Sequence, residues 1–440
     1  MGIIASRAGH GPSARELAAA TPASRDRYVD LLRVASLAVV VLGHWLMAAV
    51  TPEGQVGNLL AVVPGLQILT WALQVMPVFF FVGGFSHALA HRSRPQYADF
   101  LRARLQRLLR PTTVFIGVWS ALALAVQLLG ADDGLTGVAL RLVAQPLWFT
   151  GIYLAMVAFT PPLLRLHVRW GWGAFAALTA GAVLVDLLRF AGGVPYVGFL
   201  NFGLVWLAIH QLGFLRADGL LRRPGLLAAA GLTGAGLLVR FGPYPLSMVG
   251  MPGEKVSNMA PPTLALLCHG LWLVGAVELL KGPGARFAAR ARVWRAVVAA
   301  NGVAMTAFLW HLTAMLGVYG TLLALGTRLP EPASAGWWAQ TPPRLIAAAV
   351  VTALLVALFR RFEQPSARPA GALTPGRGGG RLAALGITLA LLGVLGLSMT
   401  GFGGLLEGHT ATLVAVQVSA PAAVAMALAG WFLVERAGRE

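Results

Sequence analysis

Two residues in the first long apolar segment, Arg33 and His44, are the first candidates for chemistry. In an α-helix their spacing of 11 residues places them within about 20° of the same face and about 16 Å apart along the axis. A guanidinium binds anionic groups, and a neutral imidazole can act as a general base toward a hydroxyl. The pair indicates an anion-binding mouth with a titratable group deeper inside. From spacing alone, an interpretation in which Arg33 extends to an interface and His44 hydrogen-bonds a neighbouring helix is equally open.

A second group of candidates is the basic segment at 100–111, FLRARLQRLLRP, which contains Arg104 and Arg107. Two arginines three residues apart share one helix face, and their guanidinium groups can bind a phosphate through two parallel hydrogen bonds. A commoner explanation is their place beside an apolar segment, where basic residues orient a membrane protein or contact anionic lipid head groups. On composition alone that explanation is preferred.

The composition shows what kind of element must position these residues. Of the 440 residues, 57% are hydrophobic and 11% are charged, and the mean hydropathy is +0.73, whereas a soluble domain carries about 25% charged residues. Because so few charges cannot cover a water-facing surface, lipid must surround most of the chain. The net charge of +18 would suggest nucleic acid in a soluble protein. Here the basic residues stand in short loops between apolar runs, so we expect no nucleic-acid partner.

Apolar runs of about 20 residues, the length that crosses a bilayer as a helix, predict an all-α polytopic membrane bundle with twelve spans. We place them at 31–50, 64–89, 111–130, 147–164, 172–190, 197–215, 225–241, 261–280, 297–325, 344–360, 382–402 and 411–434. The long spans 64–89 and 297–325 are expected to be tilted, or broken at Pro77 and Gly302. With the N-terminus in the cytoplasm, 28 of the 34 Lys and Arg residues fall on the cytoplasmic side, as the positive-inside rule requires. We therefore expect an integral protein of the plasma (inner) membrane with both termini in the cytoplasm.

Four segments follow from this map: a cytoplasmic tail at 1–24, a ten-span domain at 25–365, a Pro-, Gly- and Arg-rich cytoplasmic linker at 366–381, and a two-span hairpin with a short tail at 382–440. The tail has no apolar core, so the first span is expected to act as an uncleaved insertion signal. The single cysteine, Cys268, excludes a disulfide within the chain. The sequence contains no HExxH, CxxC or Walker pattern, so we expect neither a metal site nor ATP hydrolysis.

Further polar residues fall within the apolar segments, where such groups are costly and are functional candidates for that reason. They are His87, His210, His269, His311, Asp186 with Arg189, and Glu278. Any one of them is more often a hydrogen bond between packed helices than a ligand. Asp186 and Arg189, three residues apart, could simply neutralise each other.

Six motifs occur along the chain in an order that resembles the acyltransferase-3 family of integral membrane acyltransferases. They are Arg27 followed by Asp30-x-x-Arg33 and His44; MPVFFFVGGF at 76–85; Arg104-Leu-Gln-Arg107; PLWFTGIYL at 146–154, with Trp148; FLWH at 308–311, ending in His311; and RFEQP at 361–365, with Glu363. Each motif alone is weak, but six in order over about residues 25–365 make the resemblance specific. Gly83 stands where the family usually has Ser and Phe308 where it often has Tyr, and both departures could reshape the pocket.

The resemblance implies an enzyme that takes an acyl group, often acetyl, from acyl-CoA on the cytoplasmic side and passes it to a hydroxyl. The acceptor is commonly a sugar of a cell-envelope polysaccharide, a lipid-linked glycan or a secondary metabolite. The resemblance also implies His44 as the catalytic residue, with Arg33 assisting it, His311 as a further candidate, and Arg104 and Arg107 as ligands of the CoA phosphates. A direct base mechanism and an acyl-His intermediate both stay open.

Two other classes of protein are compatible with parts of this pattern. A proton-coupled transporter or lipid flippase would share the span count and the buried His and Arg residues. A membrane acyltransferase of a second type, the MBOAT family, would place its key histidine late in the chain, so that His311 would dominate. The basic pair at Arg104 and Arg107, together with the shared face of Arg33 and His44, favours the acyltransferase-3 interpretation.

Overall fold

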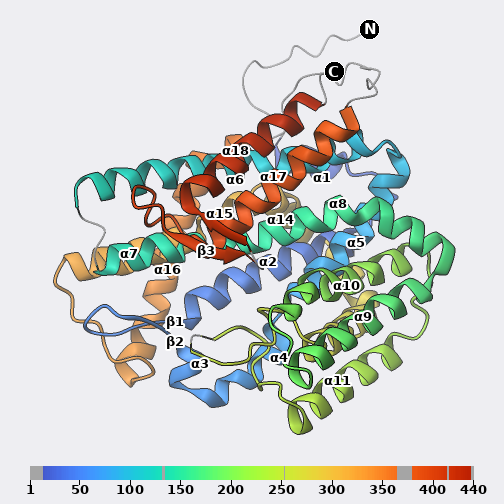
Figure 1. Cartoon of the computed structure of the whole chain (residues 1–440), viewed down its shortest axis with the longest axis horizontal. Coiled ribbons are helices and arrows are strands. Elements are labelled where there is room, and N and C mark those ends of the chain that lie inside the picture. The colour runs from blue at the N-terminus through green and yellow to red at the C-terminus, as the bar shows by residue number, and fades with distance from the viewer. Residues whose placement is uncertain (1–12, 131–133, 252, 364–378, 414–415, 438–440) are drawn as a thin grey trace.

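A computed structural model of the chain describes residues 13–130, 134–251, 253–363, 379–413 and 416–437. Its long helices form one bundle (Figure 1). Eleven helices in these residues are long and apolar enough to cross a membrane, and a pair of helices bent by 58° would make a twelfth span. The predicted class is confirmed: the chain is an all-α, multi-pass integral membrane protein.

The spans, some of them built from consecutive pieces, follow the predicted order. They consist of α2 (Arg27–Met47), η1 (Pro64–Leu69) with α4 (Thr70–Leu73) and α5 (Met76–Ser93), α6 (Tyr97–Leu128), α7 (Gly134–Leu142) with α8 (Pro146–Trp170), α9 (Trp172–Phe190), η2 (Val197–Leu200) with α10 (Asn201–Ala217), α11 (Pro224–Phe241), α12 (Leu264–Leu279) bent against α13 (Lys281–Ala289), α15 (Ala304–Ala324), α16 (Ala335–Phe359) with η3 (Arg360–Phe362), α17 (Gly379–Thr400) and α18 (Ala420–Ala437). The remaining elements are α1 (Ala14–Ala19), α3 (Leu59–Val62), α14 (Ala291–Asn301), and two antiparallel pairs of short strands, β1 (Ala48–Val50) with β2 (Val56–Asn58) and β3 (Thr410–Leu413) with β4 (Val416–Ser419).

The helix of the third span begins earlier than predicted. The span was expected to start at Pro111, with Arg104 and Arg107 in the preceding segment, but α6 runs unbroken through that proline. Its buried side includes Leu101 and Leu105, so an apolar stripe continues the helix into the basic segment. Both arginines therefore stand on the same rigid helix as the third span.

The two long predicted spans are broken near the expected residues. Helix α4 ends before Gln74 and Val75, and α5 begins with Pro77 in its first turn, where a proline costs no hydrogen bond. Gly302 follows the last residue of α14 and separates it from α15. Interruptions near Pro77 and at Gly302 are thus confirmed, and the pieces around Pro77 still make one continuous span, Pro64–Ser93.

Two other predicted span boundaries are wrong as well. Residues 411–413 and 416–419 lie in β3 and β4 rather than in the start of a helix, because these residues are rich in Thr and Val, which favour strands. Arg344 was expected in the loop at the start of the tenth span, but it lies inside α16. That helix begins earlier because the Ser334 side chain caps it by accepting a hydrogen bond from the Trp337 amide.

Glycines bring α5 and α10 into close contact. A Cβ atom on Gly84 would lie 2.0 Å from the carbonyl oxygen of His210, and one on Gly213 would lie 2.3 Å from the carbonyl oxygen of Phe81. Small residues permit this approach of membrane helices, which gain stability from tight packing in place of a hydrophobic driving force. The pair α5–α10 is thus a rigid support for the side chains that α5 presents.

The C-terminal hairpin of α17 and α18 packs along α8 and α6 (Figure 1). Gly151 of α8 faces Leu395 of α17 so closely that a Cβ atom there would lie 2.4 Å from the leucine Cδ2. The hairpin is also tied to the body by a hydrogen bond from the Phe402 amide to the Leu140 carbonyl. Most of the predicted linker 366–381, and residues 1–12 of the predicted tail, lie outside the described residues.

Candidate functional site

Two histidines that are 267 residues apart in sequence meet in the bundle. His44, near the end of α2, and His311, on α15, lie with Nδ1 of the first 2.8 Å from Nε2 of the second. Their rings stack with centroids 5.0 Å apart and an interplanar angle of 15°. Trp45 fixes the two helices together, because its indole N–H donates to the carbonyl of His311 at 3.0 Å. The structure thus joins the two predicted histidines into one unit.

The surroundings set the direction of this hydrogen bond. Nδ1 of His311 faces the carbonyl oxygen of Phe308, which can only accept, so Nδ1 carries the proton. In the neutral ring Nε2 of His311 is then an acceptor, and Nδ1 of His44 must donate to it. This arrangement leaves the lone pair on Nε2 of His44. His311 is fully buried whereas His44 keeps part of its surface exposed, so His44 is the more accessible member of the pair.

Arg33 is held in place at the other end of the same helix face. Its guanidinium donates to Asp30 at 3.0 Å and to the Ser86 hydroxyl at 2.7 Å. Asp30 is buried and also accepts two hydrogen bonds from Arg25, at 2.6 and 3.1 Å. The Asp30 carboxylate therefore accepts hydrogen bonds from two guanidinium groups, those of Arg25 and Arg33, and the site keeps an excess of positive charge. Asp30 acts on Arg33 rather than on a substrate.

Arg104 contacts Ser86 of α5, the same residue that Arg33 contacts. Its guanidinium donates to the Ser86 carbonyl at 2.9 Å, and within the described residues it has no ion pair with a carboxylate. Arg33 and Arg104 are close enough to repel each other electrostatically. Two like charges held around one serine form a site that an anion would stabilise.

The second arginine of the motif has a different neighbour. Arg107 lies within electrostatic range of Glu363. That carboxylate accepts from the Met305 amide at 2.9 Å and from the Thr306 amide and hydroxyl at 2.8 and 2.6 Å, so it caps the start of α15. Burial raises the pKa of Glu363, and the hydrogen bonds from Thr306 offset part of that rise. Glu363 therefore positions the helix that carries His311.

The other motif residues are not part of this cluster. The Arg27 guanidinium stacks over the ring of Trp294 on α14, 5.1 Å from its centroid. Trp148, partly buried, packs edge-on against Phe149 with ring centroids 6.2 Å apart. The ring of Phe149 in turn contacts Phe308 at 4.9 Å. Trp148 thus supports the aromatic packing around α15.

The remaining buried polar residues have local partners. His269 lies 3.0 Å from the Trp71 carbonyl, and Glu278 pairs with Arg216 at 2.7 Å. Asp186 accepts hydrogen bonds from Asn201, Tyr244 and the Leu264 amide. Asp186 and Arg189 form no ion pair within 4.0 Å in the described part of the chain, although their opposite charges still attract each other.

A buried row of three polar groups beside the two guanidiniums was not predicted as a unit. Nδ1 of His87 lies 3.0 Å from Nε2 of His210, and its Nε2 lies 3.0 Å from the Tyr153 hydroxyl. A Cβ atom on Gly83 would lie 3.3 Å from the Tyr153 ring, so this tyrosine occupies the space that a serine at position 83 would need. The sequence analysis singled out His87 and His210 separately as buried polar residues, and Tyr153 stands in the motif at 146–154, but nothing in the sequence joined the three.

Within the described residues no group of three or more His, Cys, Asp or Glu side chains could hold a metal ion. In comparison with known proteins, the family model of acyltransferase type 3, described as an acyltransferase domain, matches residues 26–361. The matched part ends before α17 and α18 and contains Arg33, His44, Arg104, Arg107 and His311, whereas Glu363 lies two residues beyond it. No curated protein and no solved structure matches the chain.

Proposed function

The chain belongs to the acyltransferase-3 family of membrane acyltransferases, and on that premise we propose that it transfers an acyl group, by default acetyl, from acyl-CoA to a hydroxyl. The acceptor proposed is a sugar of a cell-envelope polysaccharide, a glycolipid or a related metabolite. The observation that carries the proposal is the pairing of His44 with His311. In this pair Nε2 of His44 keeps a lone pair, which a general base needs to take a proton from a hydroxyl.

The reaction follows from this arrangement. Nε2 of His44 takes the proton of the acceptor hydroxyl while the oxygen attacks the thioester carbonyl carbon. The new C–O bond forms, the C–S bond breaks, and the thiolate of CoA leaves and receives the proton from His44. The charge that His44 gains is stabilised through its Nδ1–H bond to His311, as a positioned partner stabilises an imidazolium. An acyl group carried on Nε2 of His44 is the alternative route through the same atom.

The donor site that we propose lies around Ser86. The phosphates of acyl-CoA and its thioester are at opposite ends of the cofactor, and the two parts of the cluster are also separated along α2. Arg33 and Arg104 meet at Ser86 and are proposed to bind the phosphates, with Arg107 nearby on the same helix. This end of the bundle is rich in Lys and Arg, which supports a cytoplasmic position for it, where acyl-CoA is available.

The proposal is tested with the purified full chain in lipid nanodiscs. Acetyl-CoA and a panel of p-nitrophenyl glycosides are supplied, and CoA release is followed with a thiol-reactive dye. We expect acceptor-dependent CoA release and acetylated glycoside by mass spectrometry. Equal acceptor-dependent turnover by wild type and His44→Ala would overturn the assignment of His44. Proton-coupled movement of a solute in the absence of CoA would instead favour the transporter.

A further inference from the structure

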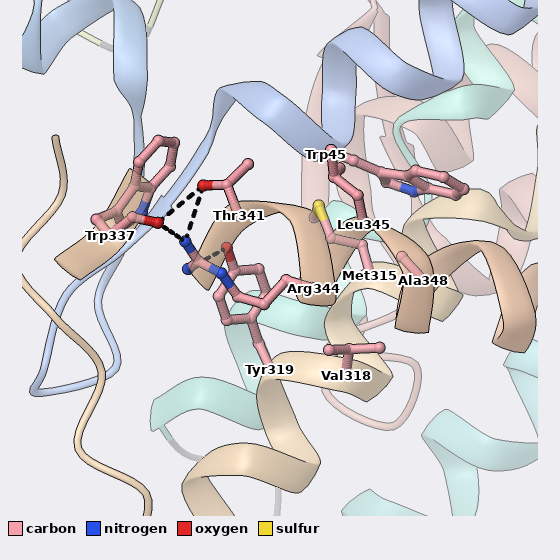
Figure 2. A pocket seen from close by; sticks show the side chains of 9 residues that line it. All are labelled: Trp45, Met315, Val318, Tyr319, Trp337, Thr341, Arg344, Leu345 and Ala348. Atoms are coloured by element: carbon pink, nitrogen blue, oxygen red, sulfur yellow. Dashed lines mark hydrogen bonds between the residues drawn. The ribbon is translucent and has the colours of Figure 1, made fainter. Parts of the chain in front are cut away.

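Arg344 of α16 is a buried cation that lines a small pocket together with Trp45, Tyr319 and Trp337 (Figure 2). It is 9% exposed. Its guanidinium donates to the Gln340 carbonyl at 3.2 Å, the Tyr319 hydroxyl at 3.0 Å, the Trp337 carbonyl at 2.8 Å and the Thr341 hydroxyl at 3.2 Å. Within the described residues it has no ion pair with a carboxylate.

The hydrogen bonds leave the charge of Arg344 without a counter-ion. An arginine has five N–H donors, and the four bonds to neutral oxygens leave one on the nitrogen that faces Tyr319. The rings of Tyr319 and Trp337 lie 5.5 and 5.0 Å from the guanidinium carbon and contribute cation–π attraction. A buried cation is still costly without a negative partner. An anionic ligand would supply that partner.

The pocket lies beyond the histidines when the helices are followed from the Arg33 end. Trp45, which lines it, follows His44 directly, and on α15 the lining residues Met315 and Tyr319 come after His311. Both helices pass the histidine pair before they reach the pocket. The cluster therefore has two cationic positions, Arg33 with Arg104 on one side of the pair and Arg344 on the other.

We propose that Arg344 binds an anionic group of the acceptor, a carboxylate or a phosphate attached to the sugar, and so directs the acceptor hydroxyl toward His44. This inference rests on the proposed acyl transfer. The donor phosphates occupy the cations at one end, which leaves the cation at the other end for the second substrate. The positive charge, the one remaining N–H of the guanidinium and the two aromatic rings beside it suit a charged sugar better than an uncharged lipid chain.

The test measures binding, so it does not depend on turnover. Wild type, Arg344→Gln, Arg344→Lys and Arg104→Gln in nanodiscs are titrated with p-nitrophenyl glucuronide, p-nitrophenyl glucoside, glucose 6-phosphate and CoA. We expect wild type to bind one of the anionic sugars at least about 10-fold more tightly than the neutral glucoside, as a charge-assisted hydrogen bond provides. The affinities for the glucuronide and for glucose 6-phosphate show whether the site prefers a carboxylate or a phosphate.

The variants separate the two cationic positions. Arg344→Gln should lose the preference for the anionic sugar and keep its affinity for CoA, whereas Arg104→Gln should do the reverse. Arg344→Lys keeps the charge and should retain a weaker preference. A wild type without preference for either anionic sugar overturns the inference, even if the variants fail to fold, and so does a preference that survives in Arg344→Gln. If the wild type prefers the anionic sugar but catalyses no acyl transfer, the proposed function is contradicted and the anion site is not.

Discussion

The direction of the hydrogen bond between the two histidines makes a prediction about His311→Ala. In the intact pair His311 accepts from Nδ1 of His44 and thereby keeps the lone pair on Nε2, where a hydroxyl can use it. Without His311 the proton of His44 can move to Nε2, and the ring can rotate. His44 is then still present, but part of its population carries the proton on Nε2 and cannot take a proton from the hydroxyl at that atom.

The size of the effect follows from the bond that is lost. A neutral hydrogen bond contributes about 0.5–1.5 kcal/mol, which corresponds to a ~2- to 13-fold change in the population of the active tautomer. Removal of a general base altogether costs about 10²- to 10⁴-fold. We therefore expect kcat to fall by roughly 10-fold in His311→Ala and by at least about 100-fold in His44→Ala. Because His311 acts through His44, the double variant should be no slower than His44→Ala.

The assay is CoA release from acetyl-CoA with a glycoside acceptor, per mole of folded protein in nanodiscs. His269→Ala is a matched control, since it removes another buried imidazole that lies beside a backbone carbonyl but outside the cluster, and its kcat should stay unchanged. The reasoning is refuted if His311→Ala loses as much activity as His44→Ala. It is also refuted if the two losses multiply in the double variant, which would give His311 a role of its own on the substrate.

Three further predictions follow from single contacts. Arg104→Gln should raise KM for acetyl-CoA by about 10-fold or more and leave KM for the acceptor unchanged, because Arg104 lies at the donor end; steady-state kinetics with each substrate varied would show otherwise. Glu363→Ala leaves three donors at the start of α15 without their acceptor and should lower the unfolding free energy by about 1–3 kcal/mol, which an unchanged melting temperature would contradict. Gly84→Ala places a Cβ atom 2.0 Å from a backbone oxygen of α10 and should lower the unfolding free energy by about 1–3 kcal/mol. The control Gly117→Ala, with no atom within 4 Å of its Cβ, should not destabilise the protein. Equal melting temperatures of the two variants would exclude the close packing of α5 and α10.

Much of the membrane topology could be predicted because it depends on local composition. Each apolar run of about 20 residues has to become a helix in lipid, since no other segment satisfies its own backbone hydrogen bonds there. The ends of the helices were harder to predict, because they depend on capping hydrogen bonds and on packing against other helices. Ser334 starts α16 early enough to place Arg344 inside it, and nothing in the hydropathy of that segment indicates a cap.

The candidate site was predicted as separate residues and not as a set of contacts. The helical spacing of Arg33 and His44 is a local property, so their shared face could be inferred from sequence. The contact of His44 with His311, and of Arg104 with Ser86, depends on how α2, α15, α6 and α5 pack. Periodicity within one helix carries no information about its neighbours, so the contact of Tyr153 with His87 could not be predicted, although Tyr153 stands in the motif at 146–154.

One helix, α15, connects the parts of the cluster in a fixed register. Glu363 caps its first turn at Thr306, His311 follows about one and a half turns later, and Tyr319 bonds Arg344 about two turns beyond. These groups lie roughly 8 and 12 Å apart along the axis, and the helix has no proline at which it could bend. A shift at the Glu363 cap would therefore move the histidine pair and the Arg344 pocket together. Separate loops could not hold three groups in such a relation, and this is a physical reason to carry His311 on a long span rather than at its end.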